Sequence, residues 1–250
     1  ILANLAAAAK RNADRGYPDV ALFEVGPAWH DDMPEGQETV AAGLRHGARS
    51  PRHWDVPVRP VDVFDAKADA LAALSAAGAP VANLQVDRTA HGHYHPGRSG
   101  VLRLGPNVLA QFGELHPAVL RGLDLDGATV GFEVYVGRIP AAKAKAGRAR
   151  PALDASALQP VTRDFAFLVA ADCPADDVAR SAMAAEKGMI ADVSVFDVFA
   201  GEALGADRKS VAVSVTLQPR DSTLTEAEID AIAAKIVANV EKRTGATLRG

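Results

Sequence analysis

Four features that would each indicate a particular class of protein are absent from this 250-residue sequence. Cys173 is the only cysteine, so no disulfide can form within the chain, and no His or Asp placed near it suggests a catalytic thiol. No run approaches the roughly 18 consecutive apolar residues of a membrane-spanning helix. A signal peptide and a glycine-rich phosphate-binding motif are also absent. We therefore expect a soluble cytoplasmic protein with an inert Cys173.

Positive charge is not in excess either. The formal net charge is -4, and residues 157–250 carry 10 Lys and Arg against 14 Asp and Glu, while the first 156 residues are neutral overall. Proteins that attract nucleic acid through their overall field are usually basic. Any contact with RNA must therefore be local.

The composition supports a folded protein, and one segment divides the chain. Hydrophobic residues make up 48% of the sequence, enough for a substantial core. Between residues 138 and 156 the apolar pattern stops, and basic residues alternate with alanine, glycine and proline. We interpret residues 141–156 as a basic linker between a domain of residues 1–140 and a domain of residues 157–250.

The first domain is predicted to be mostly antiparallel sheet with helical cover. The chain opens without methionine on an alanine-rich apolar helix, so we expect this domain to be truncated at its N-terminal end. A helix is predicted over residues 61–77, because Val61, Phe64, Ala68, Leu71 and Leu74 recur at spacings of three and four. The residues from 105 to 107, Gly-Pro-Asn, predict a tight hairpin. Short apolar runs predict strands over residues 20–25, 40–45, 83–86, 101–104, 108–114 and 129–136.

The second domain shows the ferredoxin-like order βαββαβ. Thr225 and Glu228 predict a capping box at the start of its second helix, and Pro174 is predicted at the first helical position of its first helix. An apolar stripe on the second helix consists of Ile229, Ile232, Ile236 and Val240. The expected strands are residues 163–169, 190–199, 209–217 and 246–249, and the expected helices are residues 175–185 and 226–243.

Alternation along the strands predicts which face of this sheet the helices leave open. In the third strand the apolar positions 211, 213, 215 and 217 should face the helices, and Ser210 and the small residues that alternate with them should face away. In the first strand, Phe165 and Phe167 suit the core and Ala166 the open face. In the second strand, Phe196 and Val198 suit the core and leave Asp197 and Phe199 on the open face.

Five short motifs resemble the ferredoxin-fold anticodon-binding domain that ends the beta subunit of bacterial phenylalanyl-tRNA synthetase. Each motif alone is weakly specific, but all five occur in the family's order and cover residues 160–250 almost completely. They are QPVTRDFAF at 159–167, FDVFAG at 196–201, RKS at 208–210, TLT at 223–225 with Glu228, and ATLRG at 246–250.

Three motifs in the first domain, LFEVG at 22–26, HPGRS at 95–99 and GELHP at 113–117, resemble the noncatalytic, class II synthetase-like core of the same subunit. The resemblance implies an α+β protein in which a partial core of this kind precedes the anticodon-binding domain. It further implies an alpha2-beta2 ligase that uses ATP and Mg²⁺ to attach phenylalanine to tRNA(Phe), with the alpha subunit as partner. No catalytic, cofactor or metal residue is then expected in this fragment.

The resemblance also implies a binding site for the anticodon on the open face of the sheet. The positions that match the family's RNA contacts are Asp197, Phe199, Ser210 and Arg249. An aromatic ring can stack on an unpaired base, Asp and Ser can bond to base edges, and Arg can pair with phosphate. The family typically has tyrosine where Phe199 stands, so only the stacking contact is expected.

Two other interpretations of the sequence compete with this one. His91, His93 and His95 alternate as in some metal sites, but no carboxylate or cysteine accompanies them, and we favour a structural turn. A ferredoxin-like domain can also sense a small ligand or serve only in assembly. Binding assays with amino acids, tRNA and the alpha subunit would separate these possibilities.

Overall fold

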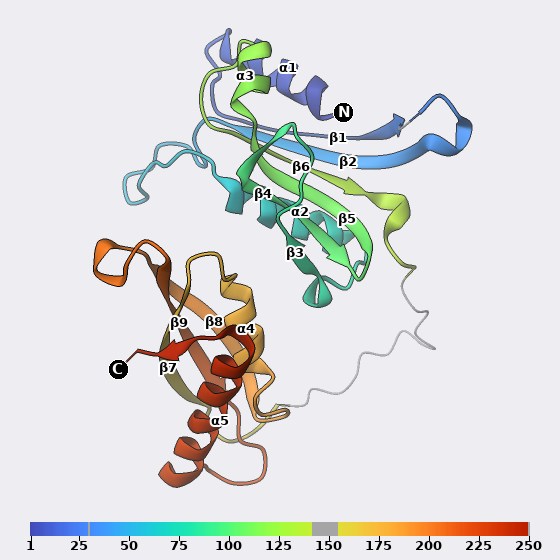
Figure 1. Ribbon diagram of the computed structural model, residues 1–250. Helices are drawn as coiled ribbons and strands as arrows, with labels where there is room; N and C mark the ends of the chain where they lie inside the picture. The colour runs from blue at the N-terminus through green and yellow to red at the C-terminus, as the bar shows by residue number, and fades with distance from the viewer. Residues whose placement is uncertain (30, 142–154, 250) are drawn as a thin grey trace. The chain divides into compact units, whose positions relative to one another are not determined.

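The structure is a computed structural model that describes residues 1–29, 31–141 and 155–249. The chain divides into two compact units, one before and one after the gap at residues 142–154 (Figure 1). The predicted linker, residues 141–156, falls almost entirely outside the described residues. No helix in the described part of the chain is long and apolar enough to span a membrane.

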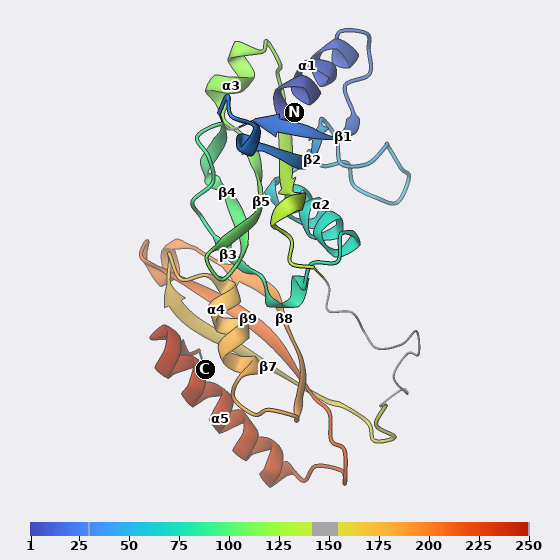
Figure 2. The same ribbon diagram turned by 90° about the vertical axis from the view of Figure 1, so that its right-hand side faces the viewer.

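The first unit is built on an antiparallel sheet with the strand order β1-β2-β6-β5-β4-β3. Its strands are β1 (Val20–Trp29), β2 (Gln37–His46), β3 (Gln85–Asp87), β4 (Tyr94–Leu104), β5 (Asn107–Leu115) and β6 (Thr129–Tyr135). Its helices are α1 (Leu2–Ala13), α2 (Val63–Ala76) and α3 (Pro117–Gly122). Helix α1 packs on Val40, Ala42 and Leu44 of β2, while α2 packs on the opposite face over β5 and β6 (Figure 2).

The six predicted strands of this unit are confirmed with shifted ends. The largest shift is in β4, which begins at Tyr94 instead of residue 101 and contains Pro96. The predicted hairpin is confirmed, since β4 ends at Leu104 and β5 begins at Asn107. Gly105 has φ +60°, a left-handed conformation that favours glycine in such a turn.

Helix α2 confirms the predicted helix, and the repeat that indicated it matches the buried residues only in part, since Val61 and Leu74 are buried. Phe64 is 72% exposed, and the residues buried against the sheet include Ala66, Ala70 and Leu74. Small alanines let the helix lie close to the strands, and Asp65 occupies the buried position next to them in the first turn. The buried face is therefore rotated relative to the predicted repeat but still includes Leu74, whereas Phe64 faces solvent.

Asp65 is buried because two arginines and the helix cap surround its carboxylate. Arg49 Nε donates to Oδ1 at 2.8 Å, and the two Arg59 Nη atoms donate to both oxygens at 2.8 and 2.9 Å. The backbone amide of Asp62, the N-cap of α2, donates to Oδ2 at 3.0 Å. The hydrogen bonds from Arg59, opposed by burial, lower the pKa of Asp65 to about 2.

We expect Asp65→Asn to destabilise the first unit by about 1 to 3 kcal/mol at neutral pH, because it removes charge-assisted hydrogen bonds. The carboxylate stabilises the fold at pH values above its pKa in the unfolded chain, and this contribution is lost as the pH falls through about 2. The difference between the two proteins should therefore shrink below about pH 4. Urea unfolding followed by near-UV circular dichroism measures it, since Tyr94 and Tyr135 are buried in this unit.

Asp126→Asn, at an exposed position, is the matched control and should change nothing. An equal loss for Asp65→Asn at pH 2 and pH 7 would contradict the ionic explanation.

The second unit confirms the predicted βαββαβ order. Strands β7 (Val161–Ala170), β8 (Ile190–Phe199), β9 (Arg208–Leu217) and β10 (Thr247–Leu248) form an antiparallel sheet in the order β10-β7-β9-β8. Helices α4 (Ala175–Met183) and α5 (Glu226–Thr244) share one core with a single face of that sheet (Figure 2).

The local signals in this unit are largely confirmed. Thr225 and Glu228 form the predicted capping box, and the predicted stripe on α5 is buried. Pro174 is the N-cap of α4, one position before the predicted one, with Asp176 and Asp177 in the first turn, where the helix dipole favours negative charge. Alternation in β9 is as predicted, because the apolar positions from Val211 to Leu217 are at most 1% exposed.

The prediction that Phe196 and Val198 lie in the core is wrong. Phe196 is 58% exposed and Val198 is 49% exposed. A register shift between Val195 and Asp197 leaves Phe196 without a partner on β9, which is the geometry of a β-bulge. Val198 does lie opposite the buried Val211. However, β8 is an edge strand, so Val198 has a neighbouring strand on one side only and stays partly exposed.

Candidate nucleic-acid interface

One row of residues crosses all four strands of the second unit on the face away from the helices. The register places Thr247 opposite Leu168, Leu168 opposite Ser210, and Ser210 opposite Phe199. Residues directly opposite each other in antiparallel strands project to the same face. Ser210 therefore shares a face with Phe199, and this is the open face because the neighbouring Val211 is in the core.

The adjoining row brings in the other two predicted site residues. Ala212 lies opposite both Ala166 and Asp197, and the backbone amide of Arg249 donates to the Ala166 carbonyl at 2.8 Å. Arg249 thus continues the register of β10 by one residue. The structure places Asp197, Phe199, Ser210 and Arg249 in two neighbouring rows of one face.

The four residues differ in how accessible they are. Asp197 and Arg249 are exposed, and the Phe199 ring is 46% exposed. Ser210 is only 5% exposed, because it occupies a central strand between Leu168 and Phe199. Ser210 is therefore suited to form the floor of a binding site, because its side chain does not project into solvent.

Gly201 helps to hold the Phe199 ring in place. A Cβ atom added to Gly201 would lie 2.8 Å from Phe199 Cζ, closer than real Cβ contacts allow. The ring therefore lies against the Gly201 backbone and leaves part of its surface in solvent. A ring supported in this way is ready to stack on a planar group without reorganising.

Charge is unevenly distributed along the open face. Asp164 and Asp192 are exposed in the rows toward one end of the sheet, opposite Ser214 and Thr216 respectively. Arg249 lies in the middle row with Asp197, whereas Arg208 lies in the row at the other end, two residues from Ser210 and so on the same face. Arg208 was not among the predicted site residues, although its spacing from Ser210 in the sequence places it on the same face.

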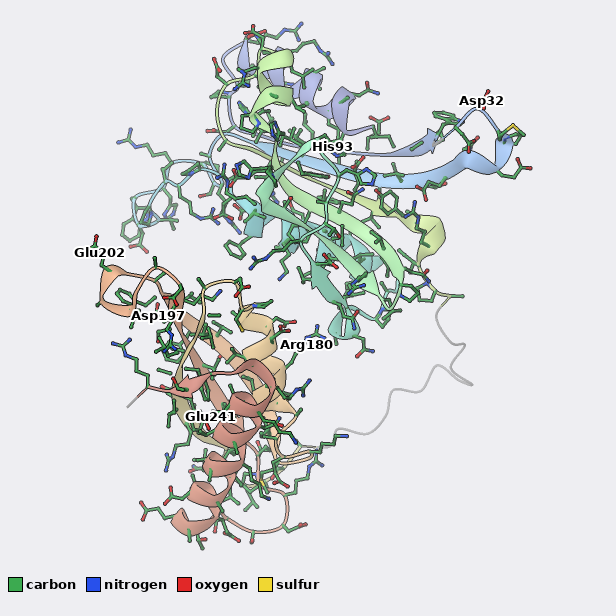
Figure 3. All side chains as sticks on the ribbon, in the orientation of Figure 1. Asp32, His93, Arg180, Asp197, Glu202 and Glu241 are labelled. Carbon is green, nitrogen blue, oxygen red and sulfur yellow. The ribbon has the colours of Figure 1, made fainter. Side chains whose placement is uncertain are left out.

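A cavity of about 430 Å³ adjoins the row that contains Phe199. It lies where β7 and β8 end and β9 begins, and it is lined mainly by small residues, with charged side chains at its edge. Figure 3 shows Glu202, one of the lining residues, toward the same end of the unit as Asp197. The lining consists of Ala171, Ala200, Gly201, Glu202, Gly205, Ala206, Arg208 and Lys209.

The three histidines of the first unit take up structural positions. His93 Nε2 lies 3.2 Å from Glu133 Oε2, and His95 Nδ1 accepts a hydrogen bond from the Gly97 amide at 3.1 Å. The backbone amide of His91 donates to the side chain of Gln111. Among the described residues, no group of three or more His, Cys, Asp or Glu side chains is placed to hold a metal ion.

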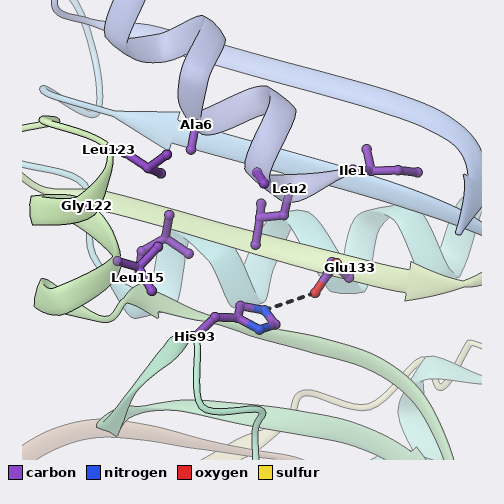
Figure 4. Close-up of a pocket in the computed structure, with 10 residues that line it drawn as sticks. Ile1, Leu2, Ala6, His93, Leu115, Gly122, Leu123 and Glu133 are labelled. Atoms are coloured by element: carbon purple, nitrogen blue, oxygen red, sulfur yellow. Dashed lines mark hydrogen bonds and ion pairs between the residues drawn. The ribbon is translucent and has the colours of Figure 1, made fainter. Parts of the chain in front are cut away.

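His93 and Glu133 border an apolar cavity of about 500 Å³ between α1 and α3 (Figure 4). Leu2, Leu115 and Leu123 supply apolar walls. Burial opposes ionisation of Glu133, but the hydrogen bond and charge of His93 lower its pKa below the ordinary value. The two polar groups therefore satisfy each other within an otherwise apolar wall.

Cys173 lies half-buried against the core of the second unit. Burial, together with the nearby Asp177, raises the pKa of its thiol. A thiol that stays protonated is a poor nucleophile, which agrees with the prediction that it is inert.

Comparison with known proteins gives the same division of the chain. The family model described as "Phenylalanyl tRNA synthetase beta chain CLM domain" matches residues 1–136, and the one described as "Ferredoxin-fold anticodon binding domain" matches residues 156–249. Among solved structures, pyrrolysyl-tRNA synthetase from Desulfitobacterium hafniense matches 54% of this chain and 45% of that chain, with 14% identity and a TM-score of 0.38. That similarity is too low to assign a fold.

Curated relatives are much more similar. The phenylalanine–tRNA ligase beta subunit of Rhodospirillum rubrum is 54% identical, and those of Paramagnetospirillum magneticum and Bradyrhizobium diazoefficiens are 52% and 51% identical. Each match includes all of this chain but only 31% to 32% of the relative, so the chain spans about a third of their length. Since one family model matches more than half of the chain and a second matches most of the remainder, the chain belongs to the phenylalanyl-tRNA synthetase beta chain family.

Proposed function

We propose that this chain is the part of a phenylalanine–tRNA ligase beta subunit that binds the anticodon region of tRNA(Phe). The observation that carries the proposal is the meeting of Asp197, Phe199, Ser210 and Arg249 in two rows on the open face of a domain that matches an anticodon-binding family. Unpaired bases are recognised by stacking on aromatic rings and by bonds to their edges. A local face of this kind needs no overall basic charge.

Each residue has a role that its position supports. The supported ring of Phe199 stacks on a splayed base, and Asp197 in the next row accepts hydrogen bonds from a base edge. Arg249 pairs with phosphate or stacks on a base. Ser210 gives the floor of the site a small polar surface.

The rest of the enzyme supplies the chemistry. In this proposal the ligase acts in the cytoplasm as an alpha2-beta2 assembly that uses ATP and Mg²⁺, and residues 1–140 form a partial class II-like core that does not catalyse. No catalytic step is assigned to this part of the chain in the proposal, and Mg²⁺ is expected on the rest of the enzyme. The task of this part is to orient tRNA, and the alpha subunit is the partner that activates phenylalanine.

The proposal is tested by titrating this chain with tRNA(Phe) and with the same tRNA carrying a changed anticodon. We expect tRNA(Phe) to bind more tightly, because the proposed site recognises the unpaired anticodon bases. Phenylalanine and other free amino acids serve as the second set of ligands. Equal binding of the two tRNAs, or binding of an amino acid in place of tRNA, would reject the proposal in favour of an assembly or a ligand-sensing domain.

The chain alone should show no phenylalanine-dependent exchange of pyrophosphate into ATP and no charging of tRNA, because activation belongs to the alpha subunit. The complete ligase, assayed in parallel, shows that the substrates are competent. Exchange catalysed by the pure chain would contradict the noncatalytic assignment of residues 1–140.

A further inference from the structure

Arg208 is placed to act on the same ligand as Phe199, although neither the sequence patterns nor the family relationship assigned it a role. In the register it lies opposite Ala170, one row beyond the pairing of Ser210 with Leu168. Residues two apart on a strand project to the same face about 7 Å apart. The guanidinium therefore belongs to the open face, next to the row that contains Phe199.

The Arg208 side chain is a cation without a structural task. It is exposed, and it makes no hydrogen bond or ion pair with the residues that the structure describes. Its neighbour Lys209 differs, because Lys209 Nζ donates to the Ala171 carbonyl at 2.9 Å and so ties β9 to the turn after β7. Of the two basic residues at the start of β9, Arg208 is thus the one available to a ligand.

The cavity beside Arg208 has a suitable size and lining for part of a nucleotide. Its volume of about 430 Å³ falls within the range of roughly 300 to 1,000 Å³ that is typical of small-ligand sites. Ala200, Gly201 and Gly205 have small side chains or none, so a sugar could approach the backbone of the cavity closely. Glu202 is the acidic residue in the lining, and it can accept a hydrogen bond from a ribose hydroxyl.

The charges on the open face also favour one direction for the backbone of a bound RNA strand. A phosphate placed toward Asp164 and Asp192 would meet two carboxylates, whereas one placed at the cavity would meet Arg208 and Lys209 with Glu202 as the single carboxylate in the lining. The backbone of a strand whose base stacks on Phe199 should therefore run toward the cavity.

We propose that Arg208 binds a phosphate of single-stranded RNA and that the cavity beside it takes the ribose next to the base stacked on Phe199. This inference rests on the proposed function and extends its site by one nucleotide.

The test is the salt dependence of tRNA(Phe) binding to the complete ligase that carries Arg208→Ala. Each phosphate contact to a single strand adds about 0.7 to the magnitude of the slope of log K against log salt concentration. We expect Arg208→Ala to reduce that magnitude by about 0.7 and to weaken binding about tenfold at low salt. Arg208→Lys should keep the slope, since a point charge suffices for phosphate.

Arg243→Ala is the matched control. Arg243 is exposed in the last turn of α5, and that helix packs on the opposite face of the sheet, so its removal should leave both slope and affinity unchanged. The preference for the correct anticodon should survive Arg208→Ala, because phosphate contacts carry no sequence information.

The outcomes separate this inference from the proposed function. If Phe199→Ala weakens binding while Arg208→Ala changes neither slope nor affinity, the phosphate site is refuted and the proposed function stands. If Arg208→Ala abolishes the anticodon preference, Arg208 reads a base and the phosphate assignment is wrong. If neither variant affects binding and the changed anticodon is bound equally well, both proposals fail.

Discussion

Phe199→Ala in the complete ligase should lower kcat/KM for tRNA(Phe) by about 5- to 150-fold, the effect of losing one base stacked on an aromatic ring. Activation of phenylalanine should not change, because pyrophosphate exchange does not require the anticodon to be held. Charging does require it, since the distant acceptor end must be positioned at the active site. Measuring both reactions on one preparation gives the comparison.

Stability and a second exposed ring provide the controls for this result. Phe199 is 46% exposed, so its removal should leave the unfolding of the second unit almost unchanged. Phe64→Ala removes a phenylalanine that is 72% exposed in the first unit and should not affect charging. A loss of charging that merely follows a loss of folded protein, or no loss at all, would remove Phe199 from the site.

Phe167→Ala is expected to destabilise the second unit by about 3 to 5 kcal/mol, the usual cost of a cavity left by a buried aromatic ring. Phe167 is 0% exposed and belongs to the core that α4 and α5 share with the sheet. Phe196→Ala, a matched change in the same sheet, should stay within about 0.5 kcal/mol, because its ring is already 58% exposed.

The chain supplies a separate probe for each unit in this experiment. Its tryptophans and tyrosines all precede residue 136, so near-UV circular dichroism follows the first unit. Cys173, the sole thiol, packs against the second core, and its rate of labelling follows the opening of that unit. Phe167→Ala should accelerate labelling and leave the near-UV transition in place. A shift of the near-UV transition instead would mean that the two units unfold together.

The sequence was sufficient where one local pattern determined the outcome. Strand β9 alternates cleanly because its apolar positions form the centre of a core and their neighbours are small, as at Val213 and Ser214. The start of α5 follows from hydrogen bonds between Thr225 and Glu228, which lie within one helical turn. Patterns that involve only residues close together in the sequence do not depend on the rest of the fold.

Other features depended on contacts that a local pattern does not contain. Asp65 can be buried on α2 because Arg49 and Arg59 reach its carboxylate from the loop before the helix. The exposure of Phe196 results from a register shift against β9, which changes no composition or periodicity in β8. Neither the burial of Asp65 nor the exposure of Phe196 follows from the apolar pattern of its own helix or strand.

The candidate site was predicted by two different routes. Alternation alone placed Ser210 on the open face, while Asp197, Phe199 and Arg249 were suggested chiefly by the family resemblance. The register supports their proximity, yet it also buries Ser210 and adds Arg208 to the same face. The accessibility of a residue on the sheet depends on the size of the side chains opposite it on neighbouring strands. The sequence of one strand alone does not reveal these neighbours.

The bulge at Phe196 also determines the face to which the end of β8 presents its side chains. Before the bulge, Val193 and Val195 lie opposite the buried Val215 and Val213, whereas after it Asp197 and Phe199 lie opposite residues of the open face. The extra residue therefore inverts the odd and even positions of the strand. Deletion of Phe196 would remove the bulge but keep Asp197 opposite Ala212 and Phe199 opposite Ser210. A strand paired regularly through Phe196 would instead turn both side chains toward the helices. The orientation of these two proposed site residues therefore depends on the bulge only while the strand contains the extra residue.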